Sequence, residues 1–104
     1  MRKTRILIAD DHDVVRSGLK ALLRTSPEFA IVGEAGDGEE AVRRVEELLP
    51  DIVMMDISMP RLDGIEATRL VRSQRDPPAV IFLSTCDADD LVLRDLQAGA
   101  GGFL

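Results

Sequence analysis

Three aspartates follow directly after apolar segments of the chain. Residues 6–9 (Ile-Leu-Ile-Ala) lead into Asp10 and Asp11, and residues 52–55 (Ile-Val-Met-Met) lead into Asp56. Apolar runs of this kind are typical of parallel strands buried on both faces, and the carboxyl ends of such strands meet at one edge of the sheet. Clustered carboxylates repel one another unless a cation neutralises them, and Mg²⁺ prefers oxygen ligands. The pattern therefore predicts a magnesium site suited to phosphate chemistry.

The composition fits one globular domain. The chain has 104 residues, of which 45% are hydrophobic, and this length allows a single core. The net charge of -6 opposes nucleic-acid binding by this domain, because phosphate contacts need clustered Lys and Arg. The lone Cys86 cannot form an internal disulfide. No segment approaches the roughly 18 apolar residues of a membrane span and no signal peptide precedes the first strand, so we expect a cytoplasmic protein without membrane contact.

Strands and helices alternate along the chain. The expected strands are residues 5–10, 29–35, 51–56, 79–83 and 100–104, and the expected helices begin near Asp13, Asp37 and Asp63 and, for the fourth, cover 88–98. Such βα units in series predict an α/β, flavodoxin-like doubly wound parallel sheet of strand order 2-1-3-4-5. In this order the first and third strands are neighbours, so the three aspartates meet at the switch point between them.

Apolar residues at helical spacing predict the inward faces of the helices. These are Val15, Leu19, Leu22 and Leu23 in the first helix, Ala41, Val42, Val45, Leu48 and Leu49 in the second, and Ile65, Leu70 and Val71 in the third. Asp13 is expected to cap the first helix.

The segment at residues 36–41 offers an alternative interpretation. It satisfies the G-x-G-x-x-A form of a dinucleotide fingerprint, and Asp56 follows about 20 residues later, where a ribose-binding acid is expected. Acidic side chains such as Asp37 and Glu40 would repel a pyrophosphate at this helix start, and these two residues favour a capping box instead. An aspartyl phosphatase is disfavoured because Ser58 stands where its second acid is expected, and a non-phosphorylated interaction module remains a further alternative.

Three motifs in the expected order resemble the receiver domain of bacterial response regulators. They are residues 6–12, residues 50–60 with 63–65, and residues 98–104, which together extend over the whole chain. The sequence is most similar to that of the NarL/FixJ subfamily at residues 10–12, 32–35 and 38–41. Members of this subfamily usually carry a C-terminal helix-turn-helix (LuxR-type) output domain. The resemblance implies a CheY-like receiver domain over residues 1–104 that acts in two-component signalling with a sensor histidine kinase and is not itself an enzyme.

The resemblance also implies a role for each matching residue. Asp56 matches the phospho-acceptor and is also counted among the metal ligands. Asp10 and Asp11 match the acidic pair that holds Mg²⁺, and the main-chain carbonyl of Ser58 completes the protein ligands. His12, next to this pair, is expected to be solvated and without a chemical role.

Ser84 and Phe103 match the switch residues of the family. Ser84 would hydrogen-bond the phosphoryl group and Phe103 would turn inward, although Phe103 is equally consistent with core packing. Receivers place a Lys just beyond the Gly-Phe-Leu stretch, followed by a last helix, whereas this sequence stops at Leu104. We therefore expect a C-terminally incomplete receiver that buries its uncovered apolar face in a homodimer or an exchanged dimer. DNA binding would need an output domain outside this chain.

Overall fold

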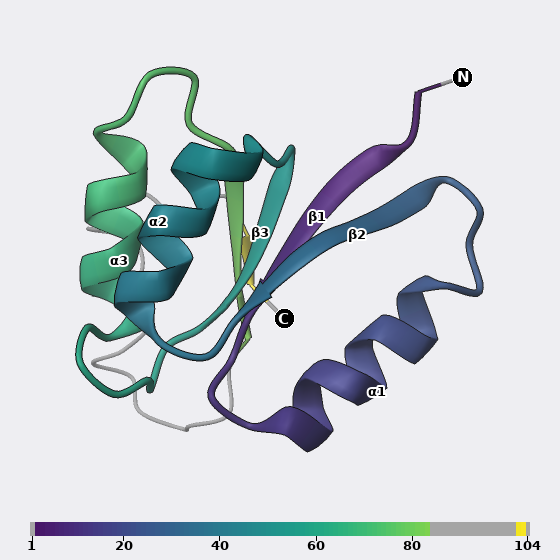
Figure 1. The fold of residues 1–104 in the computed structure, drawn as a ribbon, viewed down its shortest axis with the longest axis horizontal. Coiled ribbons are helices and arrows are strands. Elements are labelled where there is room, and N and C mark those ends of the chain that lie inside the picture. Colours follow the sequence, from purple (N-terminus) through teal and green to yellow (C-terminus); the bar gives the residue numbers. More distant parts are fainter. Residues whose placement is uncertain (1, 84–101, 104) are drawn as a thin grey trace.

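A computed structural model describes residues 2–83 and 102–103. Its strands form one parallel sheet in the order β2-β1-β3-β4-β5 (Figure 1). The elements are β1 (Thr4–Ala9), α1 (Asp13–Leu23), β2 (Phe29–Ala35), α2 (Gly38–Leu48), β3 (Ile52–Asp56), α3 (Gly64–Arg72), β4 (Ala79–Leu83) and β5 (Gly102–Phe103). The predicted flavodoxin-like sheet and strand order are confirmed, with the switch point between β1 and β3. The helix expected over residues 88–98 lies outside the described residues.

The sheet carries helices on both faces. α2 and α3 pack together on one face, and α1 lies on the other (Figure 1). Because side chains alternate along a strand, Leu7 and Ala9 of β1 join the core beneath α2 and α3, whereas Ile6 and Ile8 join the core beneath α1. All four side chains are at most 2% exposed. This two-sided burial explains why the strand reads as a continuous apolar run.

The start of α1 differs from the prediction that Asp13 caps it. The helix begins at Asp13 itself, and the residue in the cap position, His12, makes no side-chain hydrogen bond to the helix. Asp13 forms an ion pair with Arg16 one turn later. A carboxylate in the first helical turn is well placed for an i,i+3 pair, and this pair replaces the predicted cap.

Three leucines predicted to face the core are exposed instead. Leu22 is 66% exposed, Leu49 61% and Leu70 47%. Leu22 and Leu70 each precede a residue that takes the inward position, Leu23 and Val71, and neighbouring helical residues point about 100° apart. Leu49 ends α2 with a φ of 50°, so its side chain leaves the apolar stripe of that helix.

Two glycines allow the loop after β3 to pack closely against its surroundings. A Cβ atom at Gly64 would overlap with the carbonyl oxygen of Asp56, and a Cβ atom at Gly38 would overlap with that of Leu62. The amide of Gly64 donates to the carbonyl of Ile57 at 2.8 Å. The start of α3 is therefore held against the end of β3, and the start of α2 against the same loop.

Candidate metal and phosphoryl-transfer site

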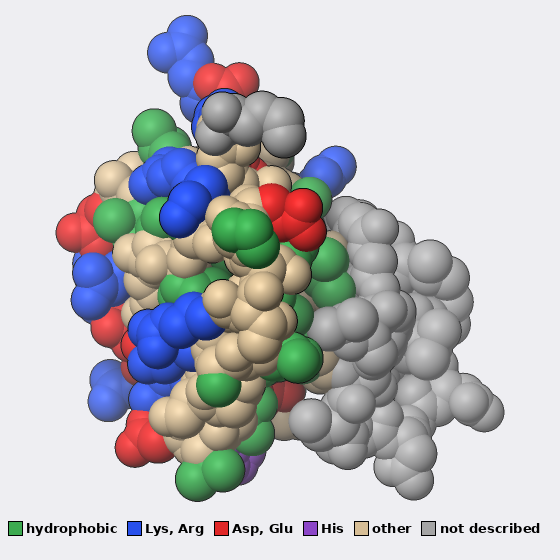
Figure 2. All heavy atoms as spheres, turned by 90° about the vertical axis from the view of Figure 1, so that its right-hand side faces the viewer, with side chains coloured by type: hydrophobic (Ala, Val, Ile, Leu, Met, Phe, Trp, Pro, Cys, Tyr) green, Lys and Arg blue, Asp and Glu red, His purple; other side chains and the backbone are tan. Residues whose placement is uncertain are grey.

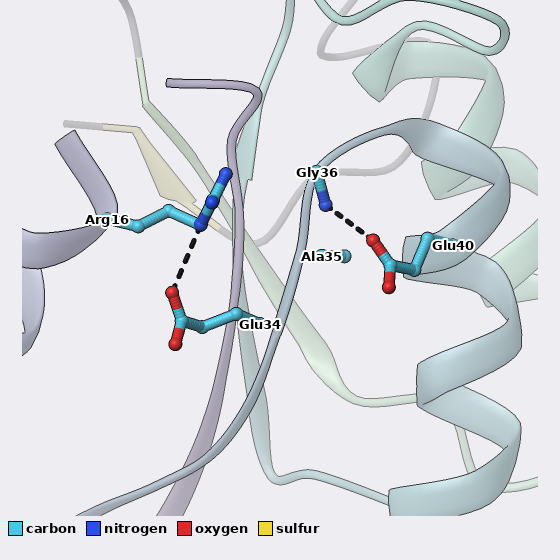
Figure 3. Close-up of a pocket in the computed structure, with 5 residues that line it drawn as sticks. All are labelled: Arg16, Glu34, Ala35, Gly36 and Glu40. Carbon is cyan, nitrogen blue, oxygen red and sulfur yellow. Dashed lines mark hydrogen bonds and ion pairs between the residues drawn. The ribbon is translucent and has the colours of Figure 1, made fainter. Parts of the chain in front are cut away.

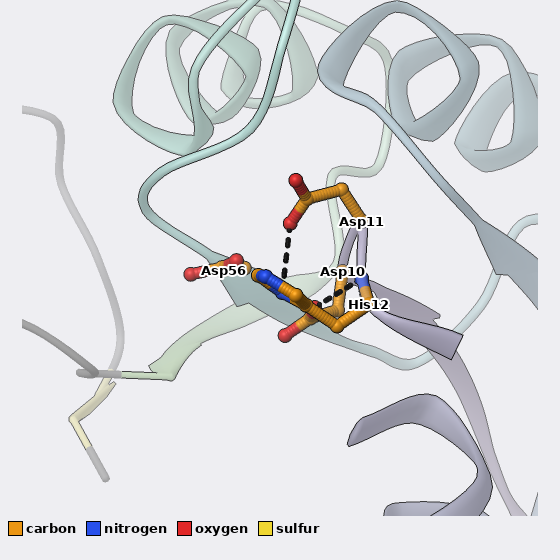
Figure 4. A group of neighbouring side chains, drawn as sticks. All are labelled: Asp10, Asp11, His12 and Asp56. Carbon is orange, nitrogen blue, oxygen red and sulfur yellow. Dashed lines mark hydrogen bonds and ion pairs between the residues drawn. The ribbon is translucent and has the colours of Figure 1, made fainter. Parts of the chain in front are cut away.

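The sheet register brings strand-end carboxylates together. β1 and β3 pair in parallel, and one residue past the last pair Asp10 lies opposite Asp56. One carboxylate oxygen from each of Asp10, Asp11 and Asp56 and a ring nitrogen of His12 all lie within 4.8 Å of one another (Figure 4). The three acids expected at the switch point therefore form one cluster.

The donor atoms of this cluster suit a hard cation. Asp10 is 0% and Asp56 1% exposed, whereas the side chain of Asp11 is 30% exposed. Asp10 Oδ1 accepts a hydrogen bond from the amide of His12 at 2.8 Å, but Asp10 Oδ2 is buried with no hydrogen-bond partner in the described part of the chain. A buried carboxylate oxygen without a partner is costly, and a bound cation removes that cost. Oxygen donors and an unpartnered buried oxygen fit Mg²⁺.

The carboxyl group of Asp56 has a raised pKa. Burial, with the nearby charge of Asp10, raises the pKa of the Asp56 carboxyl from 3.8 to about 6. The amide of Ser58 donates to Asp56 Oδ1 at 3.3 Å and opposes this rise. A cation beside the cluster favours the carboxylate form, which is the form able to act as a nucleophile. A role for the Ser58 carbonyl as a metal ligand stays a prediction.

His12 lies closer to the acids than the sequence suggests. Its side chain is 65% exposed, in keeping with a solvated residue, yet Nδ1 is 3.0 Å from Oδ1 of Asp10 and 3.0 Å from Oδ1 of Asp11. The hydrogen bond to Asp10 and the charge of Asp11 raise the pKa of the imidazole. His12 therefore interacts electrostatically with the acids. Its position directly after Asp10 and Asp11 in the sequence was the signal that could have indicated this interaction.

Arg16 is a second neighbour that the sequence does not single out. Its guanidinium donates to the carbonyl oxygen of Asp10 and, at 3.0 Å, to Glu34 Oε1 (Figure 3). In the sequence, the position of Arg16 one turn after Asp13 indicates a contact only with Asp13. The contact with Glu34 could not be predicted, because Glu34 lies on another element, β2. Arg16 thus connects α1, β2 and the end of β1.

Comparisons with known proteins agree with this geometry. The response regulator receiver domain family matches residues 6–104. The chain belongs to this family. The receiver is 44% identical over 100 residues to the transcriptional regulatory protein YdfI of Bacillus subtilis, a match that covers 96% of this chain and 46% of that protein. It thus spans about half the length of the curated relatives it matches.

Solved structures show the same receiver fold. The signal receiver domain of the response regulator NarL from Mycobacterium tuberculosis is 38% identical with a TM-score of 0.95, over 100% of this chain and 84% of that one. A chain of the CheX–CheY–BeF3–Mg²⁺ complex from Borrelia burgdorferi is 33% identical with a TM-score of 0.86, over 99% of this chain and 78% of that one. The predicted family and its function in two-component signal transduction are therefore confirmed. Receivers are signalling modules whose acidic pocket binds Mg²⁺, and the aspartate cluster found here can hold such an ion.

Ser84 and Phe103 are the predicted switch residues of this receiver. Ser84 follows Leu83, which pairs with Asp56 between β4 and β3, but Ser84 itself lies outside the described residues. The backbone of Phe103 pairs with that of Phe82 in the sheet, and its side chain lies outside the described part. The roles of Ser84 and Phe103 stay predictions.

The glycine segment at residues 36–41 of the receiver forms a helix start. Asp37 Oδ1 accepts a hydrogen bond from the amide of Glu40 at 2.8 Å, as the capping interpretation predicts. The side chain of Glu40 accepts from the amide of Gly36 at 2.7 Å instead of that of Asp37, so the reciprocal bond is displaced by one residue (Figure 3). These amides are already paired, and the carboxylates lie where a pyrophosphate would bind.

The described residues contain no helix long and apolar enough to cross a membrane.

Proposed function

We propose that this receiver accepts a phosphoryl group on Asp56 from the phosphohistidine of a sensor kinase, with Mg²⁺ held by Asp10 and Asp11. The observation that carries the proposal is the buried carboxylate of Asp56, 1% exposed and within 4.8 Å of the acid pair at the neighbouring strand end. This arrangement supplies a nucleophile and the ligands for the cation that a phosphoryl transfer requires.

The transfer itself needs little protein chemistry. An oxygen of the Asp56 carboxylate attacks the phosphorus in line, an O–P bond forms, and the N–P bond to the kinase histidine breaks with its electron pair returning to the imidazole. The product is an acyl phosphate. The cation, when bound, offsets the repulsion between the anionic nucleophile and the anionic phosphoryl group. Asp10, Asp11 and the Ser58 carbonyl would hold it, and the Ser58 amide orients Asp56 through its hydrogen bond to Oδ1.

Phosphorylation then acts as a switch. The modification adds about 1.5 to 2 negative charges at one edge of the sheet, and the Ser84 hydroxyl and the Phe103 ring respond to it. The domain is consumed as a substrate of the kinase in each cycle, so we infer that it is a signalling partner without an enzymatic turnover of its own. A cytoplasmic location follows from this partner. Transcription regulation through a DNA-binding output domain is the proposed output, supported by the regulatory relative whose length the chain half covers.

The decisive test is labelling with a small phosphodonor such as acetyl phosphate in the presence of Mg²⁺, read by intact mass and peptide mapping. We expect one phosphoryl group on Asp56 and none in Asp56→Asn. The matched control is Asp76→Asn, which makes the same change at an exposed position and should label like the wild type. Labelling that persists in Asp56→Asn, or that maps to His12, would refute the assignment. A wild-type chain that takes up no label would favour a non-phosphorylated interaction module.

A further inference from the structure

The guanidinium of Arg16 joins three parts of the receiver. Nη1 donates to the carbonyl oxygen of Asp10 at the exit of β1, Nε donates to Glu34 Oε1 of β2 at 3.0 Å, and Nη2 pairs with Asp13 at the start of α1. The Arg16 side chain is 17% exposed, so most of it is shielded from water. Charge-assisted hydrogen bonds from a rigid planar group fix orientation better than a flexible ammonium does.

These contacts act on the peptide that joins the two proposed metal ligands. The amide of Asp10 donates to the carbonyl oxygen of Ala35 at 3.0 Å, and the carbonyl of Asp10 accepts from Arg16, so the backbone of Asp10 is held on both sides. That carbonyl belongs to the same peptide group as the amide of Asp11. The orientation of this single peptide therefore sets the directions in which both carboxylates leave the chain.

Glu34 provides the anchor for Arg16. Its Oε1 accepts from Arg16, and its Oε2 accepts from Lys20 Nζ at 2.8 Å. The hydrogen bond from Lys20, together with the bond from Arg16, lowers the pKa of the Glu34 carboxyl. Arg16 is thus tied to β2 by a carboxylate that does not bind the proposed cation (Figure 3).

We propose that Arg16 is a positioning residue for magnesium: anchored on Glu34, it holds the Asp10–Asp11 peptide in the orientation that lets both carboxylates bind one cation. The inference rests on the proposed function, in which Asp10 and Asp11 hold Mg²⁺. Its effect is opposite in sign to that of the Arg16 charge. A positive charge near a cation site weakens cation binding by repulsion, whereas correct placement of the ligands strengthens it.

This difference in sign allows a clean test by isothermal titration of Mg²⁺ at fixed ionic strength. Loss of an outer-shell partner typically weakens metal binding by about 10-fold or more, so Arg16→Ala should weaken Mg²⁺ binding by about 10-fold. Arg16→Lys keeps the charge but cannot reach all three partners with one ammonium group, and should also weaken binding, by a smaller factor. Arg69→Ala is the matched control, because it removes an exposed arginine paired with Glu66 on α3, and should bind Mg²⁺ like the wild type.

A structural signature accompanies the loss of affinity. Without Mg²⁺, the amide resonance of Asp11 in a proton–nitrogen correlation spectrum should shift in Arg16→Lys, while amides of α3 should stay in place. Urea unfolding in EDTA reports whether each variant folds. If Arg16→Ala does not fold, Arg16→Lys carries the test, because it keeps the positive charge and changes only the geometry of the contacts.

Two failures are distinguishable through Asp11→Ala. If the wild type and Asp11→Ala bind Mg²⁺ equally, the proposed metal site is wrong and the inference falls with it. If Asp11→Ala loses binding while folded Arg16 variants bind Mg²⁺ as tightly as the wild type or more tightly, the metal site stands and the positioning role of Arg16 is overturned.

Discussion

Replacing Asp56, the proposed phospho-acceptor, by asparagine should stabilise the domain at neutral pH. Burial and the neighbouring Asp10 raise the pKa of Asp56 from 3.8 to about 6. The unfolded chain therefore releases this proton at lower pH than the folded domain does, and stability falls as the pH rises through this interval. A shift of about two pH units, at about 1.4 kcal/mol each, destabilises the wild type by about 3 kcal/mol above pH 7. Asparagine carries no charge and removes this penalty.

The measurement is urea unfolding of wild type and Asp56→Asn in EDTA between pH 4.5 and 8. The stability advantage of the variant should be about 3 kcal/mol at pH 8 and should shrink to about 1 kcal/mol at pH 4.5, because the folded wild type is already protonated at that pH and only the unfolded chain still ionises. Mg²⁺ should reduce the advantage at pH 8 by neutralising the cluster. Asp76→Asn, at an exposed turn with a φ of 53°, serves as the control and should show no such pH dependence. An Asp56→Asn variant no more stable than the wild type at pH 8 would refute the electrostatic account.

Three further substitutions test the packing around the site by urea unfolding. Gly64→Ala places a methyl group onto the carbonyl oxygen of Asp56, so it should destabilise the domain by about 3 kcal/mol, and a near-neutral result would contradict the close approach. Gly18→Ala, its matched control, adds a methyl group within α1 where nothing lies within 4 Å, and should stabilise by up to about 1 kcal/mol. Arg61→Gly relieves a φ of 70° at the cost of a 3.6 Å ion pair with Asp37, and a net gain of roughly 0.5–1 kcal/mol is expected; a loss would show that the ion pair outweighs the strain.

The sequence predicts the parts of this fold that follow from local pattern. β2 and β4 have the predicted bounds, because turn residues and prolines flank short apolar runs. The convergence of the three aspartates also follows from sequence, since each comes at or just after the end of a buried strand. The strand order is different in kind: helical and strand periodicity do not fix it, and the order 2-1-3-4-5 follows only from the doubly wound arrangement expected of βα units in series.

Contacts between distant elements are what the sequence could not supply. Arg16 reaches Glu34, 18 residues away on β2, and this contact exists only once α1 has packed against the sheet. Adjacent leucines such as Leu22 and Leu23 satisfy the same helical pattern, and the angle of the helix on the sheet decides which of them is buried. The sequence allows Asp13 either to cap α1 or to form an ion pair within the helix. In the structure it forms the ion pair, because Arg16 lies one turn later.

The position of the two proposed metal ligands at the exit of β1 has a consequence for how the site moves. Asp10 is fully buried, and its amide donates to the carbonyl of Ala35 in β2, the strand next to β1, whereas Asp11 lies past the strand end with its side chain partly in solvent. Hydrogen exchange of the Asp10 amide is therefore expected to require separation of β1 from β2. Exchange of the Asp11 amide is expected to require only a local fluctuation of the turn. Asp10 is therefore held for as long as β1 stays paired with β2, whereas the side chain of Asp11 can change its position on a much shorter timescale when a ligand binds.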